Sequence, residues 1–195
     1  MRIVEYFKPQ FLLGLTATPE RMDGRNIYEI CDYNVPYEIS LKDAINKGML
    51  VPFHYYGIFD KTDYSQLHQV RGKYDDRELN QTYIGNERRY ELIYKNYCKY
   101  GSKRALGFCC SKEHAKDMAK EFCRRGIPSV AVYSDAHGEY TEDRGIAIQK
   151  LMQGEIRVIF SVDMFNEGVD IPAVDMVMFP VSYTHLRAHE TGAYL

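Results

Sequence analysis

The stretch RALGFCCSKEHAKDMAKEFCRRGIPSVAVY, residues 104–133, decides the fold class of this chain. The apolar run Arg104–Cys110 is typical of a buried strand, and Ser111 is a favoured N-cap residue for the amphipathic segment that follows. Gly126 would end that helix, and Ser129–Tyr133 is again apolar and β-branched. A strand, a helix and a second strand at this spacing predict an α/β protein, with a parallel sheet and helices on its faces.

The same alternation continues toward the C-terminus. Thr141 is expected to cap another helix with two acidic residues in its first turn, and Gly154 is expected to end it. Two further strands are expected at Arg157–Val162 and Val174–Phe179. The second half of the chain is therefore predicted to form one open sheet, whose ligands would bind where the strands end.

The first half of the chain is less regular. Phe11–Thr16 and Pro52–Phe59 each predict a strand, the first of them buried, while Ser40 opens a capping box for a short helix that Gly48 would close. Residues 78–100 are predicted to form one helix. Its tyrosines gather on one face, for which core or interface packing is expected: Tyr83, Tyr90, Tyr94 and Tyr97.

Charge and hydropathy exclude several classes of protein. The 195 residues include 25 basic and 27 acidic ones, so the net charge of −2 excludes a polybasic nucleic-acid binder but not a local groove. The longest apolar runs, such as Phe11–Leu15 and Val174–Pro180, are far shorter than the roughly 18–20 residues of a membrane span. The N-terminus lacks the layout of a secretory signal. We therefore expect a cytoplasmic protein without membrane contact.

The cysteines and one polar loop invite assignments that the residues do not support. Five cysteines without a CxxC pair are expected to be reduced and structural. A zinc site could be drawn from Cys110, His114 and Cys123, but this spacing matches no common ligand pattern, so no metal site is predicted. Ser134-Asp135-Ala136-His137 holds the residue types of a hydrolase triad, but neighbours in one loop rarely converge as a triad must.

A basic face is predicted on the helix after Ser111. Such a face is expected to be solvated, with nucleic-acid contact as the alternative. Its residues are Lys112, Lys116, Lys120, Arg124 and Arg125.

Three turns after predicted strands carry hydroxyls, backbone N–H groups or a carboxylate, where a phosphate or a ribose could bind. The first, Leu13–Arg21, resembles motif III of superfamily 2 DEAD/DEAH-type helicases. The second, the strand before Ser111 with Ser111 itself, resembles motif IV. The third, Arg157–Pro172 with Gly168-Val169-Asp170 at its core, resembles motif V. Taken together over residues 2–179, they resemble the bacterial branch that contains the type III restriction subunits.

The resemblance implies two RecA-like lobes that bind ATP in the cleft between them and nucleic acid across their top. Residues 1–50 would be the end of lobe 1, and residues 51–179 would be most of lobe 2. Hydroxyls suit contacts to a nucleic-acid backbone, which carries no sequence information, and Ser161 keeps the hydroxyl of the threonine usual at its position. The implied roles are ATP coupling at Thr16, Ala17 and Thr18, ATP contacts at Gly168 and Asp170, nucleic-acid contacts at Ser111 and Ser161, and a helix arginine at Arg144.

Three parts of an ATP-hydrolysing helicase do not occur in this sequence. There is no G-x-x-x-x-G-K-[ST] phosphate loop and no Asp-Glu dipeptide for a metal-holding box, both of which the resemblance places before Met1. Nothing after Phe179 resembles motif VI with its arginine finger. We therefore expect part of an ATP-dependent helicase or DNA translocase that uses ATP and Mg²⁺, the part being inactive alone.

The partners that this reading implies are nucleic acid, DNA rather than RNA, and the missing parts of the same parent chain. One alternative is a non-catalytic module that binds nucleic acid or another partner. The other is an unrelated nucleotide-binding α/β enzyme, for which a G-x-G-x-x-G would follow the first strand; the sequence has none.

Residues 180–195 are expected not to be native. Val181–Thr191 agree, codon by codon, with a transposase-type sequencing adapter read as protein, and the residues up to Leu195 fit the bases beyond its index. Adapter read-through on a truncated gene predicts that re-sequencing of the locus will not find this segment. For that reason, His185 and His189 are not interpreted as metal ligands.

Overall fold

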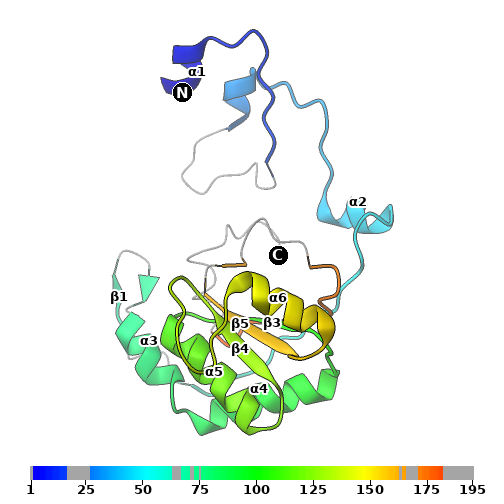
Figure 1. The fold of residues 1–195 in the computed structure, drawn as a ribbon. Coiled ribbons are helices and arrows are strands. Elements are labelled where there is room, and N and C mark those ends of the chain that lie inside the picture. The colour runs from blue at the N-terminus through cyan, green and yellow to red at the C-terminus, as the bar shows by residue number, and fades with distance from the viewer. Residues whose placement is uncertain are drawn as a thin grey trace. The chain divides into compact units, whose positions relative to one another are not determined.

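The computed structural model describes residues 2–16, 27–62, 67–70, 73–74, 76–162, 164–165 and 171–181. The described chain divides into two units at the Phe59–Asp60 bond, each with its own elements (Figure 1). Among the described helices, none is long and apolar enough to cross a membrane.

The first unit contains three short helical elements. They are α1 (Arg2–Phe7), the 3-10 helix η1 (Ile27–Cys31) and α2 (Leu41–Asn46). The predicted helix at Ser40 is confirmed, since the Ser40 hydroxyl accepts a hydrogen bond from the Asp43 N–H at 3.1 Å. Gly48 then adopts a φ of +70°, the left-handed conformation that often ends a helix and that glycine adopts without steric strain.

The two strands predicted in this unit are wrong. Residues 11–16 and 52–59 run without strand pairing, and their apolar side chains are exposed, Leu15 to 88%. A strand needs a neighbouring strand to take its backbone hydrogen bonds, and neither segment has one among the described residues. Apolar and β-branched composition records only the propensity of a segment, which is insufficient when no ladder partner is present.

The second unit is built on a four-stranded parallel sheet. Its strands are β3 (Ala105–Phe108), β4 (Ser129–Val132), β5 (Val158–Ser161) and β6 (Met176–Met178), in the order β4-β5-β3-β6. A separate two-stranded antiparallel sheet joins β1 (Gln69–Val70) to β2 (Lys73–Tyr74). The predicted α/β class, with a parallel sheet flanked by helices, is confirmed.

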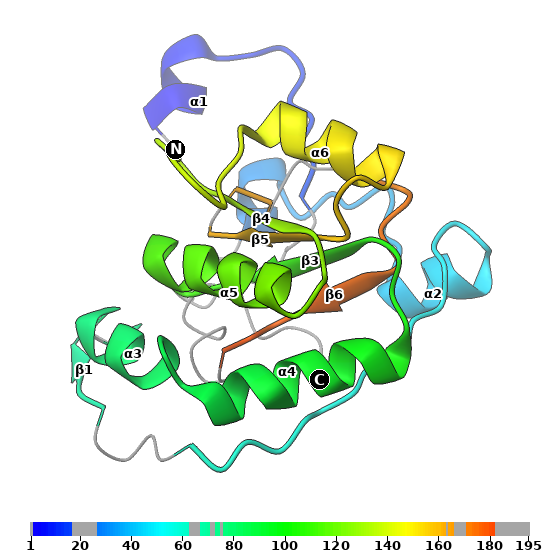
Figure 2. The same ribbon diagram turned by 60° about the horizontal axis from the view of Figure 1, so that its bottom comes forward.

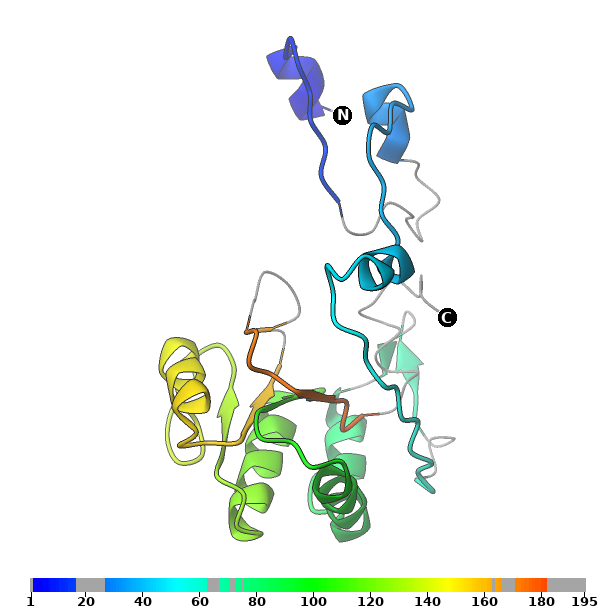
Figure 3. The same cartoon turned by 90° about the vertical axis from the view of Figure 1, so that its right-hand side faces the viewer.

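Helices cover both faces of the large sheet. Figure 2 shows α6 (Arg144–Gln153) on one face and α5 (Lys112–Arg124) with α4 (Glu87–Tyr100) on the other, and Figure 3 shows the same layers from another side. Side chains of β5 alternate between two apolar cores, as a strand requires. Val158 and Phe160 join the core under α4 and α5, whereas Ile159 joins the core under α6.

The helix predicted over residues 78–100 is broken into two. The helix α3 (Asp76–Tyr83) is separated from α4 by Gly85, whose φ is +73°, and by Asn86, whose side chain caps α4. The predicted packing of the tyrosine face is confirmed: Tyr83, Tyr90 and Tyr97 are buried, and Tyr94 is half-buried.

The start of α6 differs from the prediction by two residues. Asp143, not Thr141, is the N-cap, since its carboxylate accepts hydrogen bonds from the N–H groups of Gly145 at 2.8 Å and Ile146 at 3.4 Å. The Thr141 hydroxyl donates instead to the Gly138 carbonyl at 2.6 Å. Aspartate and threonine are both favoured N-cap residues, so residue type alone does not distinguish Asp143 from Thr141. Gly154 ends α6 as predicted.

Gly107 in β3 is required for close packing against β5. A Cβ added at Gly107 would lie 2.5 Å from ring atom Cδ1 of Phe160, which is fully buried and packs edge-on against Phe122. We expect Gly107→Ala to lower the free energy of unfolding by about 1–3 kcal/mol through overpacking, measured by urea denaturation. The control is Gly57→Ala, whose new Cβ would meet nothing closer than 3.9 Å. Equal stability of the two variants would contradict this packing.

Candidate functional site

Ser111 and Ser161 lie at the same edge of the parallel sheet. Ser161 ends β5 and stands opposite Phe108, the last residue of β3, and the Cys109 N–H donates to the Ser161 carbonyl at 2.9 Å. Ser111 lies two residues after Cys109 and is the N-cap of α5. By strand alternation Ser161 falls on the face of α6, while Ser111 belongs to the face of α5. The two predicted nucleic-acid residues therefore flank one carboxyl edge, which is called the carboxyl edge from here on.

The hydroxyl of Ser111 is fully used within the protein. It accepts a hydrogen bond from the His114 N–H at 3.0 Å, as an N-cap does, and donates to the Asn80 side-chain oxygen of α3. The residue is only 9% exposed. The only proton of the Ser111 hydroxyl is already donated to Asn80. An anion at this position would therefore be bound by the backbone N–H groups that follow Ser111, not by its hydroxyl.

The hydroxyl of Ser161, in contrast to that of Ser111, makes no hydrogen bond with the described residues. The residue is 1% exposed, and its Oγ has no hydrogen-bond partner, alone among the buried side-chain polar atoms of the described residues. A buried hydroxyl without a partner costs roughly 1–3 kcal/mol, so native proteins seldom retain one without a reason. An unpartnered donor at the end of a parallel strand is a position from which a ligand could be bound.

Arg144 also lies at the carboxyl edge. It is the first residue of α6, and its guanidinium lies 5.4 Å from the ring centroid of Phe165, which follows β5 and is buried in the core under α6. A cation over an aromatic face is held in place by the ring quadrupole. The structure thus brings Ser111, Ser161 and Arg144 to one edge.

The remaining predicted site residues are those assigned to ATP coupling and to ATP contacts. Ala17, Thr18, Gly168 and Asp170 lie outside the described residues. Thr16 is exposed and belongs to the first unit. Their ATP-related roles therefore remain predictions.

Sequence reasoning missed a buried arginine beside the carboxyl edge. The Arg89 guanidinium pairs with the Asp60 carboxylate, donates to the Thr62 hydroxyl at 3.1 Å and to the Pro180 carbonyl at 3.2 Å, and lies 4.2 Å from the Tyr83 ring centroid. Burial lowers the pKa of Arg89 to about 10, which leaves it charged at neutral pH. The available signal was a charged residue directly before Tyr90 on the tyrosine face of the predicted helix.

The alternative assignments are not supported by the described residues. Cys110 Sγ lies 3.3 Å from His114 Nδ1, but Cys123 instead exchanges hydrogen bonds with the backbone of Ser129, and no described group of three residues could hold a metal ion. In the loop of residues 134–137, the Ser134 carbonyl accepts a hydrogen bond from Lys112 Nζ at 2.8 Å. The described hydrogen bonds join none of the side chains of Ser134, Asp135 and His137.

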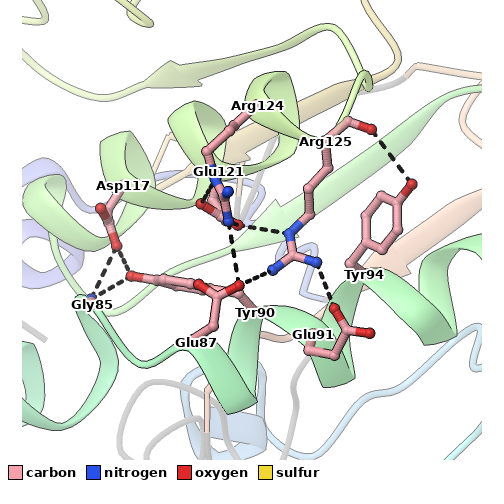
Figure 4. A network of polar contacts seen from close by, with 9 residues as sticks. All are labelled: Gly85, Glu87, Tyr90, Glu91, Tyr94, Asp117, Glu121, Arg124 and Arg125. Atoms are coloured by element: carbon pink, nitrogen blue, oxygen red, sulfur yellow. Dashed lines mark hydrogen bonds and ion pairs between the residues drawn. The ribbon is translucent and has the colours of Figure 1, made fainter.

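Two of the five residues predicted for the basic face pair with carboxylates: Arg124, the last residue of α5, and Arg125, its C-cap. Figure 4 shows Arg125 contacting Glu87, Glu91 and Glu121, each at 2.6 Å, and Arg124 contacting Glu121 at 2.7 Å and Glu87 at 3.3 Å. Hydrogen bonds from both arginines, that from Arg124 being the stronger, hold the pKa of Glu121 below its usual value. This network fastens α4 to α5.

The arginine pair offers a matched test of the network. The side chain of Arg125 is 13% exposed and touches three glutamates, whereas that of Arg124 is 59% exposed. We expect Arg125→Ala to lower the free energy of unfolding by about 1–2 kcal/mol, and Arg124→Ala to change it little. The difference between the two losses of stability should shrink as the pH falls through the lowered pKa of Glu121, because protonated Glu121 no longer needs a cation. Chemical denaturation at pH 7 and pH 3.5 measures both, and equal losses at pH 7 would contradict the assignment.

A second pair of variants tests the unpartnered hydroxyl. Ser161→Ala removes a buried donor that has no partner, so we expect unchanged stability or a gain of up to about 1 kcal/mol. Ser129→Ala is the control, since the buried Ser129 hydroxyl donates to the Ile127 carbonyl at 2.9 Å, and its loss should cost about 1 kcal/mol. If Ser161→Ala proved as destabilising as Ser129→Ala in thermal unfolding, the hydroxyl would have a partner within the protein.

Known proteins resemble the part of the chain that forms this edge. Residues 88–182 match the helicase conserved C-terminal domain family. A 51.5 kDa protein of a Lactococcus phage is 31% identical over 176 residues, which cover 88% of this chain and 36% of the phage protein. The putative ATP-dependent helicase IRC3 of Saccharomyces cerevisiae is 26% identical over 173 residues, which cover 86% of this chain and 24% of IRC3.

A third relative is the DNA 3'-5' translocase XPB2 of Sulfurisphaera tokodaii, 23% identical over 221 aligned residues, which cover 93% of this chain and 48% of the relative. The chain thus spans between 24% and 48% of the length of these three proteins. Together the comparisons show that the chain is similar to helicase C-terminal domains and to proteins named as a helicase or a translocase.

Proposed function

We propose, from the match of residues 88–182 to a helicase C-terminal domain, that this chain supplies the second lobe of an ATP-dependent superfamily 2 helicase or DNA translocase, of the branch that resembles type III restriction subunits. The nucleic-acid backbone would lie along the carboxyl edge. The observation that carries this proposal is the buried Ser161 hydroxyl, which lacks a partner among the described residues and ends the central strand of the sheet.

Backbone binding is the task that the carboxyl edge suits best. A phosphate or sugar oxygen would accept the free Ser161 proton, and the cationic Arg144 lies at the same edge. The first backbone N–H groups of α5 follow Ser111, and helix N-termini of this kind favour anions. None of these groups discriminates between bases, as translocation along any sequence requires.

ATP and Mg²⁺ would act in the complete protein. The described residues do not offer a set of three metal ligands, and the sequence holds no phosphate loop, so no catalytic step is derived from this chain. We propose that the remaining parts of the parent chain supply these groups, and that residues 1–50 belong to the other lobe. DNA is the proposed substrate, in a cytoplasmic protein.

The second candidate is a non-catalytic module that binds nucleic acid without ATP. It would use the same groups of the carboxyl edge, none of which requires ATP. An ATPase assay on this chain with and without DNA is expected to show no hydrolysis under either proposal. DNA-stimulated hydrolysis in the complete protein would favour the helicase, and its absence would favour the module.

Ser161 variants test the proposed contact directly. We expect Ser161→Ala to weaken binding of single-stranded DNA by about threefold to tenfold, since one donated hydrogen bond to a charged oxygen is lost. Ser161→Thr keeps the hydroxyl and should retain affinity. Binding is measured by fluorescence anisotropy at 50 and 200 mM salt, because phosphate contacts weaken as salt rises.

Ser129→Ala is the matched control, since Ser129 is buried at the amino end of β4, away from the carboxyl edge. It should leave the affinity unchanged despite its loss of stability. If Ser161→Ala bound DNA as tightly as the unsubstituted chain, the carboxyl edge would not be the contact surface.

A further inference from the structure

The Cys110 thiol contacts a basic side chain and has a buried cation nearby. Its Sγ lies 3.3 Å from Nδ1 of His114, in the first turn of α5. The Arg89 guanidinium of α4 lies 4.2 Å from the centroid of the Tyr83 ring, and His114 stacks on that same ring. Cys110 is half-buried, so small reagents have partial access to it. This is a nucleophile with an adjacent base and a fixed cation, the arrangement that activates a thiol.

Both basic partners are held in place by other contacts. The His114 ring is buried and stacks on Tyr83 with ring centroids 5.1 Å apart. Arg89 is buried and bonded to Asp60 and Thr62. The Asp60 carboxylate offsets part of the guanidinium charge, so the contact of Cys110 with His114 carries the activation of the thiol.

The other described cysteines lack this environment. Burial raises the pKa of the Cys109 thiol well above its usual range. Cys123 is tied to the backbone of Ser129, and Cys31 belongs to the first unit. Cys98 is exposed on α4 and serves as an internal reference for an accessible thiol.

We propose that Cys110 is a modification site that reacts with peroxides, with His114 as the group that takes and returns the proton. The thiol proton moves to His114 Nδ1, and the sulfur attacks one peroxide oxygen. The S–O bond forms as the O–O bond breaks, and the leaving hydroxide takes the proton from His114 to become water. The sulfur loses two electrons, giving Cys110 sulfenic acid, and hydrogen peroxide is reduced to water.

Oxidation at this position would affect the carboxyl edge. Cys110 directly precedes Ser111, whose hydroxyl caps α5 and holds Asn80, so an added oxygen has to be accommodated beside that cap. We therefore expect oxidation to weaken nucleic-acid binding, a consequence that rests on the proposed function, whereas the reactivity of the thiol does not.

The reactivity is tested on the intact chain by competitive labelling. The reduced protein is treated with limiting iodoacetamide between pH 5.5 and 9, and the label at each cysteine is quantified by peptide mass spectrometry. At pH 6.5 we expect Cys110 to be alkylated about tenfold faster than Cys98, because His114 beside Cys110 accepts the thiol proton as the sulfur attacks. The ratio should fall toward one above pH 9. A Cys110 rate equal to or below that of Cys98 at pH 6.5 would overturn the proposal.

Two variants complete the test of the site. Cys109→Ala removes the neighbouring thiol from the same peptide and should leave the Cys110 rate unchanged. His114→Gln should bring the Cys110 rate down to that of Cys98, and an unchanged rate in a folded protein would overturn the role of His114. The pH profile needs no variant, so failure of His114→Gln to fold leaves a decisive measurement.

Peroxide treatment then separates the modification from its consequence. Hydrogen peroxide followed by dimedone, which traps sulfenic acids, should label Cys110 before Cys98, and labelling of Cys98 first would overturn the proposal. DNA anisotropy is measured on the same samples, with Cys110→Ser as the variant that peroxide should not affect. Selective labelling in a chain that binds no DNA even when reduced would refute the proposed function and leave the modification site standing.

Discussion

The structure of the second unit depends on the double pairing of β5. This strand lies between β3 and β4, forms parallel ladders with both, and is covered by helices on both faces, so all four of its residues are buried. Gly107 of β3 makes room for the Phe160 ring within this arrangement. Because β5 is enclosed in this way, its last residue, Ser161, is buried as well and leaves its hydroxyl unpartnered at the carboxyl edge. The packing that forms the core therefore also creates the candidate site.

The helices on one face are fixed to each other as well as to the sheet. Glutamates of α4 and α5 share two arginines of α5, and Tyr90 of α4 donates a hydrogen bond to Asp117 of α5 (Figure 4). The positive charge of these two arginines is neutralised by glutamates, so it is not available to bind a nucleic-acid backbone. The basic residues that the network leaves on α5 include Lys112, which is bonded to the loop after β4.

Sequence patterns predicted the second unit well because its elements are local and strongly marked. Ser111, Gly126 and Gly154 each have a capping role that depends on a few neighbouring residues. Phe11–Thr16 shows the limit of such reasoning, since a strand depends on a partner that composition does not report. The missing partner of Ser161 depends on side-chain packing, so no pattern of residues could reveal it. Recognition of the helicase motifs pointed to the carboxyl edge of the sheet, and the roles of Ser111, Ser161, Gly168 and Asp170 remain predictions.

The central claim is that nucleic acid lies along the carboxyl edge of the parallel sheet. Hydrogen exchange of the chain with and without single-stranded DNA, read by mass spectrometry, tests it most directly. We expect slower exchange at residues 109–114 and 160–162, and no change at residues 127–129, which lie at the opposite edge of the same sheet. Protection of residues 127–129 alone, or uniform protection of the whole sheet, would contradict it.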